Sequence, residues 1–229
     1  MEQSYWFILL MAFALGMLHA LDADHIMAVT SMVSTKDGQD QSRRYSLRWS
    51  FGHSIVLLIG GIIVLFMGMA IPDELSHIAE LLVGVVLILI GLGVIREIFL
   101  KRKHLHFHQH DNLMPHAHWH EHDKNLPGQP QLHKHDHKAV MIGMLHGFAG
   151  TAPVLALLPV VHLENPLLGM IYLLLFSFGI MISMLIFGGL LHKSILKIQC
   201  YGEKMLQTIR LIIGCSALIF GVVWIQVSW

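Results

Sequence analysis

The chain is poor in charge for its length. Lys, Arg, Asp and Glu make up 13% of its 229 residues, and 55% of the residues are hydrophobic. Soluble domains carry about a quarter charged residues, so this composition, with a mean hydropathy of +0.62, argues against a soluble protein. The formal net charge is zero, which leaves no electrostatic basis for binding nucleic acid. The composition therefore predicts a protein of the lipid bilayer.

Three further absences narrow the class. The sequence holds two cysteines, which argues against a disulfide framework. No basic residue occurs in the first four positions, so a cleaved signal peptide is disfavoured and the first apolar run is expected to stay as a membrane helix. Neither a P-loop pattern nor His-Glu-X-X-His is present, which argues against ATP hydrolysis and against a membrane metalloenzyme. We predict that the chain is not an enzyme.

Six apolar segments are long enough to cross roughly 30 Å of hydrocarbon, which takes about 20 helical residues. They predict an all-α, polytopic membrane protein with six transmembrane helices. The predicted spans are Tyr5–Val33, Trp49–Ile71, Ile78–Leu100, Ala139–Val161, Leu167–Leu191 and Met205–Val227. A straight helix over the first segment would overshoot the bilayer at about 1.5 Å per residue. We therefore expect this helix to be tilted or broken.

Basic residues assign the sides of the membrane. They occur in the connections after the first, third and fifth spans, and the second and fourth connections and both termini have none. The residues concerned are Lys36, Arg43, Arg44, Arg48, Arg96, Lys101, Arg102, Lys103, Lys193, Lys197 and Lys204. Because basic segments stay in the cytoplasm, both termini are expected outside.

An internal repeat divides the chain. Residues 16–19 (Gly-Met-Leu-His) recur at 143–146, residues 50–52 (Ser-Phe-Gly) recur at 177–179, and Gly61 matches Gly188. All three matches share an offset of 127 positions (143 minus 16, 177 minus 50, 188 minus 61). Halves of three spans enter the membrane in opposite directions, an arrangement typical of transporters. We predict two inverted three-helix repeats, residues 1–100 and 139–229.

The segment between the repeats, residues 101–138, is rich in histidine. Its histidines are His104, His106, His108, His110, His116, His118, His120, His122, His133, His135 and His137. The low complexity, with several Pro and Gly residues, predicts a disordered cytoplasmic loop. Imidazoles bind metal ions readily, so the loop either collects metal or serves as a tolerated linker.

The first apolar run contains four ionisable side chains, in His19-Ala20-Leu21-Asp22-Ala23-Asp24-His25. At membrane depth such groups are costly unless they are paired or bind an ion. On a continuous helix His19, Asp22 and His25 share one side. Asp24 points away, so either the helix unwinds here or Asp24 caps a half-helix. Nitrogen and oxygen ligands together suit Ni²⁺, Co²⁺ and Zn²⁺; a proton relay or a stabilising ion network is the alternative.

Two more histidines are candidate ligands. His53 follows Gly52 near the cytoplasmic start of the second span, where an interfacial histidine is the alternative. His146 opens a stretch with Gly147 and Pro153, which predicts a kink with free carbonyl groups lining a cavity or, alternatively, a kink that serves packing. The predicted metal ligands are His19, Asp22, Asp24, His25, His53 and His146.

These residues also carry a family resemblance. Residues 19–26 (His-Ala-Leu-Asp-Ala-Asp-His-Ile) resemble the hallmark of the nickel/cobalt transporter superfamily, and residues 51–56 (Phe-Gly-His-Ser-Ile-Val) resemble a second motif of that superfamily. The resemblance implies transport of Ni²⁺ or Co²⁺, with the histidines and aspartates of the first motif essential and His53 assisting selectivity.

The second half differs from the larger permeases of that superfamily. Residues 147–153 (Gly-Phe-Ala-Gly-Thr-Ala-Pro) lack both acids of the corresponding Gly-Phe-Asp-Thr-Ala-Thr-Glu-like stretch. With its six predicted spans, the chain is more similar to the short, urease-accessory-type nickel permeases.

The resulting expectation is a multi-pass transporter of the prokaryotic cytoplasmic membrane that takes up Ni²⁺, with Co²⁺ as a second substrate. The ion is cargo, and no tightly bound cofactor is expected. The expected partners are the metal ion, the bilayer, and metallochaperones or metalloenzyme maturation proteins. The alternatives are an efflux protein whose loop collects cytoplasmic metal, or a metal sensor or storage protein that uses the loop alone.

Overall fold

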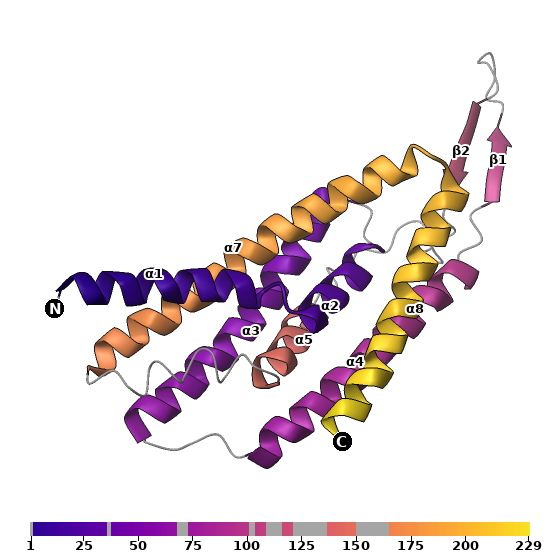
Figure 1. Ribbon diagram of the computed structural model, residues 1–229. Coiled ribbons are helices and arrows are strands. Elements are labelled where there is room, and N and C mark those ends of the chain that lie inside the picture. The colour runs from indigo at the N-terminus through magenta and orange to yellow at the C-terminus, as the bar shows by residue number, and fades with distance from the viewer. Residues whose placement is uncertain are drawn as a thin grey trace, which may run out of the picture.

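The computed structural model of the protein describes residues 2–35, 38–67, 73–100, 104–108, 116–120, 137–149 and 165–229. Over these ranges the chain forms seven α-helices and two β-strands (Figure 1). The helices are α1 (Glu2–His19), α2 (Ala23–Val33), α3 (Gln39–Met67), α4 (Asp73–Leu100), α5 (His137–Phe148), α7 (Pro166–Gln199) and α8 (Glu203–Ser228); the strands are β1 (His104–His108) and β2 (His116–His120).

Four of the helices are long and apolar enough to cross a membrane, which confirms four of the predicted spans. They comprise Gln39–Phe66, His77–Phe99, Pro166–Gln199 and Glu203–Ser228. The first predicted span is broken, as expected: α1 and α2 meet at a bend of 56°, and together they qualify as a fifth span. Of the fourth predicted span, the described residues contain α5 alone, whose 12 residues are too few to cross a bilayer. Most of that span's remainder lies outside the described residues.

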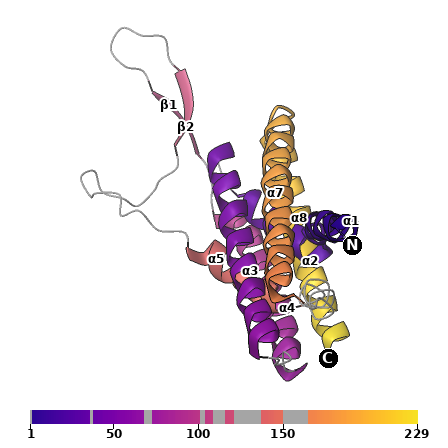
Figure 2. The same ribbon diagram turned by 90° about the vertical axis from the view of Figure 1, so that its left-hand side faces the viewer.

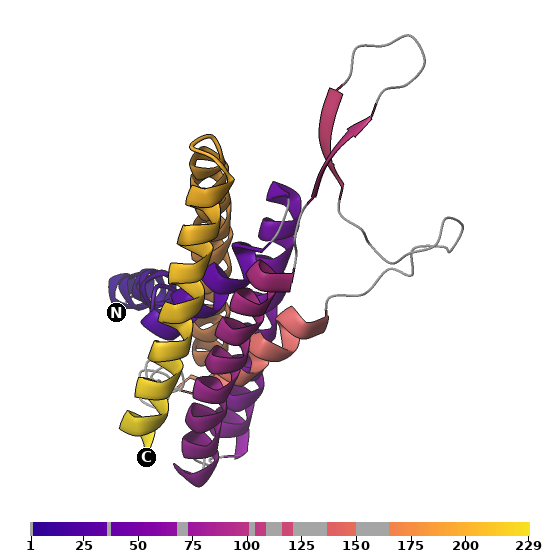
Figure 3. The ribbon, with the colours of Figure 1, turned by 90° about the vertical axis from the view of Figure 1, so that its right-hand side faces the viewer.

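The long helices are arranged as two pairs. α3 packs against α7, and α4 lies along α8 (Figure 1). The two short helices lie between these pairs, since α2 contacts both α4 and α7, and α5 contacts both α3 and α4. In Figures 2 and 3 the four long helices run in a similar direction, and α1 lies across them against α7. Helices α1, α2, α3 and α5 therefore meet in the interior; they and the turn between α1 and α2 carry the predicted metal ligands.

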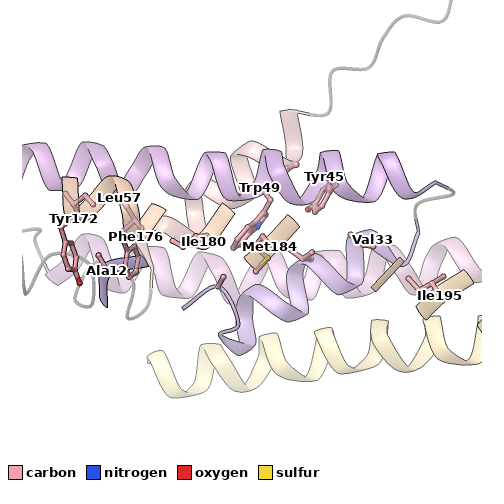
Figure 4. Close-up of a cluster of buried hydrophobic side chains, with 14 of the residues drawn as sticks. Ala12, Val33, Tyr45, Trp49, Leu57, Tyr172, Phe176, Ile180, Met184 and Ile195 are labelled. Atoms are coloured by element: carbon pink, nitrogen blue, oxygen red, sulfur yellow. The ribbon is translucent and has the colours of Figure 1, made fainter. Parts of the chain in front are cut away.

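An apolar core joins α3 to α7 (Figure 4). Tyr45 and Trp49 on α3, and Phe176, Ile180 and Met184 on α7, are fully buried. Within each helix these side chains recur four residues apart, which places them on one face. The next position along the α3 face is residue 53, so the packing that buries Trp49 also turns His53 inward.

Close helix contacts depend on glycine at corresponding places in the two halves. A methyl group on Gly16 of α1 would collide with the carbonyl oxygen of Phe176, and one on Gly143 of α5 would collide with that of Trp49. Gly143 follows Gly16 by 127 positions, and Phe176 follows Trp49 by the same number (143 minus 16, 176 minus 49). A second pair of contacts has the same relation: Gly179 with Phe13, and Gly52 with Val140. These positions admit only glycine at the observed helix spacing.

The histidine-rich segment differs from the disordered loop that its composition predicts. β1 and β2 pair in antiparallel register, and three of the five residue pairs join histidine to histidine: His104 with His120, His106 with His118 and His108 with His116. Both segments alternate histidine with Leu, Phe, Ala or Trp, and a period of two matches the pleat of a strand. The remaining histidines of this segment, apart from His137, lie outside the described residues.

Candidate metal centre

The break between α1 and α2 positions the first set of ligands. α1 ends at His19 and α2 begins at Ala23. The intervening turn is held by backbone hydrogen bonds from Leu21 N–H to Leu18 O (2.9 Å) and from Asp22 N–H to His19 O (3.0 Å). Of the two predicted arrangements, the unwound helix is therefore correct. The turn redirects the chain so that the side chains of His19 and His25 approach one another at a ring-centroid distance of 4.7 Å.

Three histidines from three helices form a compact cluster. His19 of α1, His25 of α2 and His53 of α3 are all buried, and each offers one ligand atom within 4.8 Å of the others. Nε2 of His19 lies 3.3 Å from Nε2 of His53, and the His25 ring lies 4.9 Å from the His53 ring. Neutral imidazole is the commonest protein ligand for metal ions. The spacing allows one ion to contact all three rings.

Polar contacts at Nδ1 orient two of the three rings. Nδ1 of His25 donates to the carbonyl oxygen of His19 at 3.1 Å, and Nδ1 of His19 lies 2.9 Å from Oδ2 of Asp22. A carbonyl oxygen can only accept, so the proton of the His25 ring is on Nδ1. The lone pair of His25 is then on Nε2. Partners such as this carbonyl group and the Asp22 carboxylate orient metal-binding histidines.

The two aspartates of the motif have different positions. The Asp22 side chain is 40% exposed and contacts His19 through Nδ1, so it supports a ligand from outside the cluster. Asp24 is buried, and its Oδ2 lies 3.5 Å from Nε2 of His25. Asp24 lies in the first turn of α2, where the helix dipole favours negative charge. The site therefore combines neutral nitrogen ligands with one buried carboxylate.

His146 lies beside the cluster. Its Nδ1 donates to the carbonyl oxygen of Ile142 at 2.8 Å, and its ring centroid is 5.7 Å from that of His25. Its buried Nε2 has no hydrogen-bond partner among the described residues. The residue does not belong to the group of three whose ligand atoms lie within 4.8 Å. The structure thus brings every predicted ligand to one region, with Asp22 at its edge and His146 adjoining it.

Sequence reasoning missed the aromatic side chains around the cluster. The Trp49 ring stacks on His53 at 5.4 Å and meets His25 edge-on at 4.9 Å. Phe176 stacks on His19 at 5.8 Å. One signal was available for Trp49, since a residue four positions before His53 shares its helix face. No comparable signal pointed to Phe176, which comes from the other half of the chain.

Comparisons with known proteins bear on what this centre does. Residues 5–224 match the model of a protein family, NicO, described as high-affinity nickel-transport protein. The chain belongs to the NicO family of nickel-transport proteins. The function of this NicO chain is therefore transport and not catalysis.

Two curated relatives cover most of the NicO chain. A urease accessory protein, UreH, from Bacillus sp. strain TB-90 is 33% identical over 184 residues, which are 80% of this chain and 75% of UreH. A Methanocaldococcus jannaschii protein named "Putative nickel/cobalt efflux system" is 26% identical over 219 residues, 92% of this chain and 88% of that protein. No solved structure matches the chain with significant similarity. The name of the second relative agrees with a nickel/cobalt transport family, and the apolar helices of the chain agree with a membrane protein.

The contact between Asp22 and His19 makes a testable prediction for this NicO protein. Asp22→Ala leaves Nδ1 of His19 without its carboxylate partner, and loss of such a supporting partner typically weakens metal binding by about 10- to 100-fold. The Michaelis constant for nickel transport is expected to rise by that factor. Asp40→Ala is the matched control, because Asp40 is exposed in the first turn of α3. Equal constants for the two variants would show that Asp22 does not support the site.

Proposed function

We propose that the protein carries Ni²⁺, and Co²⁺ as a second substrate, into the cell across the prokaryotic cytoplasmic membrane. The observation that carries the proposal is the buried cluster of His19, His25 and His53. Three imidazoles and the Asp24 carboxylate supply nitrogen and oxygen ligands, a set suited to divalent ions of this kind. Asp22 supports the site, and His146 provides a further ligand beside it. The ion is the cargo, and no resident cofactor takes part.

A buried ion site within apolar helices favours a transported ion over a structural one. The hydrogen bond from Nδ1 of His25 leaves its Nε2 available to an ion, and Nε2 of His19 lies 3.3 Å from Nε2 of His53. A dication there requires negative charge, which the buried Asp24 supplies. Release of the ion is easier when few of its ligands are charged, because neutral imidazoles hold it without permanent charge pairing.

We further propose that the transporter is built from two inverted repeats of three spans each, residues 1–100 and 139–229, joined by the histidine-rich segment 101–138. The glycine contacts support this architecture. Gly16 against Phe176 and Gly143 against Trp49 are the same contact made twice, with the roles of the halves exchanged. The pairing of α1 with α7 and of α5 with α3 follows the same exchange. Both termini then lie outside and the histidine-rich segment lies in the cytoplasm.

The two relatives favour different directions of transport. The name of UreH connects that protein with urease maturation, which supports uptake and, as partners, metallochaperones or metalloenzyme maturation proteins. The name of the Methanocaldococcus jannaschii relative supports efflux, and a histidine-rich cytoplasmic segment that collects metal would serve that direction. We favour uptake because the more similar relative supports it.

Accumulation of radioactive nickel in cells that express the chain decides the direction. We expect more cell-associated nickel than in cells with an empty vector. The same result is expected after deletion of residues 104–137, a control that excludes nickel bound by the histidine-rich segment without transport. Less nickel than in the empty-vector cells, together with greater metal tolerance, would establish efflux instead. Equal nickel contents with a well-expressed protein in the membrane would contradict nickel transport.

A further inference from the structure

Trp49 lies against the histidines of the candidate metal centre. The residue is 0% exposed. Its ring is nearly parallel to that of His53, with an interplanar angle of 13° and a centroid distance of 5.4 Å. It also meets His25 at 4.9 Å and His146 at 5.4 Å. One indole therefore contacts three of the four buried histidines of the site.

The indole N–H of Trp49 lacks an acceptor. Nε1 is buried and has no hydrogen-bond partner among the residues that the structure describes. Buried donors are nearly always paired, because a donor removed from water without an acceptor is costly. Indole nitrogen is a donor only, so Trp49 cannot be a metal ligand. A bare cation offers no lone pair, and so cannot be the acceptor either.

Two buried serine hydroxyl groups, next to His53 and Phe176 in the chain, are weaker evidence for an occupant of the site. Oγ of Ser54 and Oγ of Ser177 are also buried without a hydrogen-bond partner among the described residues. A hydroxyl group can rotate and can either donate or accept, so its partner is not specified by chemistry. The indole N–H has one direction and one role. Because Trp49 adjoins three histidines of the site, the occupant of the site can supply the oxygen atom or other lone pair that this N–H lacks.

We propose that Trp49 is a positioning residue that donates from Nε1 to a water molecule carried by the transported ion. This inference rests on the proposed function. It assigns the cargo as a partly hydrated divalent cation that keeps at least one water besides its imidazole and carboxylate ligands. The site then favours ions that retain a water when bound by imidazoles, over soft ions such as Cu(I), which thiolate and thioether ligands select.

The other half of the chain provides the natural comparison. Phe176 lies 127 positions after Trp49 (176 minus 49). It stacks on His19 at 5.8 Å and 25°, so it forms the same kind of wall without an N–H. Trp49→Phe therefore removes the donor and keeps an aromatic ring of a type that the chain already uses at the corresponding place.

The test compares Trp49→Phe with Trp224→Phe. Nε1 of Trp224 on α8 is also buried without a hydrogen-bond partner among the described residues. The Trp224 ring packs against Phe220 at 5.6 Å, within a separate apolar cluster that includes Val83 and Leu87 of α4. The Michaelis constant for nickel transport is expected to rise about 10- to 100-fold in Trp49→Phe, the range for a supporting partner of a metal site. It is expected to stay unchanged in Trp224→Phe.

A second readout separates positioning from packing. Visible absorption bands of Co²⁺ bound to the purified proteins at saturation report the ligands of the ion, once the histidines of the segment 104–137 are replaced by asparagine in every variant. They are expected to shift in Trp49→Phe and to match the wild type in Trp224→Phe. If Trp49→Phe elutes as aggregate, Trp49→Tyr replaces it in the test, because tyrosine keeps an aromatic ring with a hydrogen-bond donor. The affinity of Trp49→Tyr for Co²⁺ is then expected to be lower than that of the wild type but still measurable. Wild-type transport constants and Co²⁺ bands in Trp49→Phe would overturn the assignment of Trp49, and nickel transport itself would stand. Failure of the wild type to bind or move nickel would instead remove the proposed function.

Discussion

Replacing His25 by alanine is expected to reduce nickel accumulation to that of cells without the protein. His25 lies at the centre of the cluster, with its ring 4.7 Å from His19, 4.9 Å from His53 and 5.7 Å from His146. The substitution removes one of three nitrogen ligands and leaves the buried Asp24 carboxylate without its imidazole neighbour. Loss of one partner of a buried pair is more costly than loss of an exposed contact. The measurement is initial uptake of radioactive nickel, normalised to protein in the membrane.

The control for His25→Ala is His192→Ala. His192 of α7 is also buried, and its Nδ1 lies 3.2 Å from Oγ of Ser42, outside the cluster. Its loss disturbs a contact between α3 and α7 but leaves every proposed ligand in place. Nickel uptake is expected to persist in His192→Ala. Full uptake by His25→Ala at normal expression would exclude the cluster as the path of the ion.

A single methyl group is expected to disrupt the protein when it is added at Gly143 or at Gly16. The added Cβ would collide with the carbonyl oxygen of Trp49 in the first case and of Phe176 in the second. Backbone cannot move aside as a side chain can, so α5 must separate from α3, or α1 from α7. Overpacking usually costs about 1–3 kcal/mol. For a chain of this size we expect the melting temperature to fall by roughly 6–12 °C for a loss of about 3 kcal/mol.

Gly93→Ala is the matched control for these two variants. A Cβ at Gly93 of α4 meets nothing within 4 Å, and alanine favours a helix by about 1 kcal/mol over glycine. Its melting temperature in detergent is expected to equal or exceed that of the wild type. If Gly16→Ala and Gly143→Ala both melted like Gly93→Ala, the two helix contacts would not be close, and the support they give to inverted repeats would be lost.

Sequence reasoning predicted a helical membrane protein because apolar runs of about 20 residues are long enough to span a bilayer as helices. It also predicted that a helix over Tyr5–Val33 is either tilted or broken, because a straight helix of that length overshoots the bilayer, and the structure has the break. Sequence reasoning placed His19, His25 and His53 in one site because ionisable side chains at membrane depth are costly unless they are paired or bind an ion. Those predictions depend on local composition and spacing, which a sequence displays directly.

Other features of the site depend on three-dimensional direction. The separate positions of Asp22 and Asp24 follow from the bend of 56° between α1 and α2, and periodicity does not give the direction of a turn. Trp49 reads as an ordinary core residue until α2, α3 and α5 are brought together around it. The strand pairing of His104–His108 with His116–His120 was missed because composition outweighed the two-residue alternation. The aromatic and strand contacts join residues whose relation is set by tertiary packing.

The most direct test of the account is X-ray absorption at the nickel edge of the purified, nickel-loaded protein. The histidines of the segment 104–137 should first be replaced by asparagine, because they would bind nickel on their own. We predict one tightly bound Ni²⁺ per chain with imidazole scattering, and loss of both the ion and this scattering when His25 and His53 are also replaced by alanine. Imidazole-bound nickel that persists after those two replacements, or no bound nickel before them, would contradict a metal centre at the junction of α1, α2 and α3.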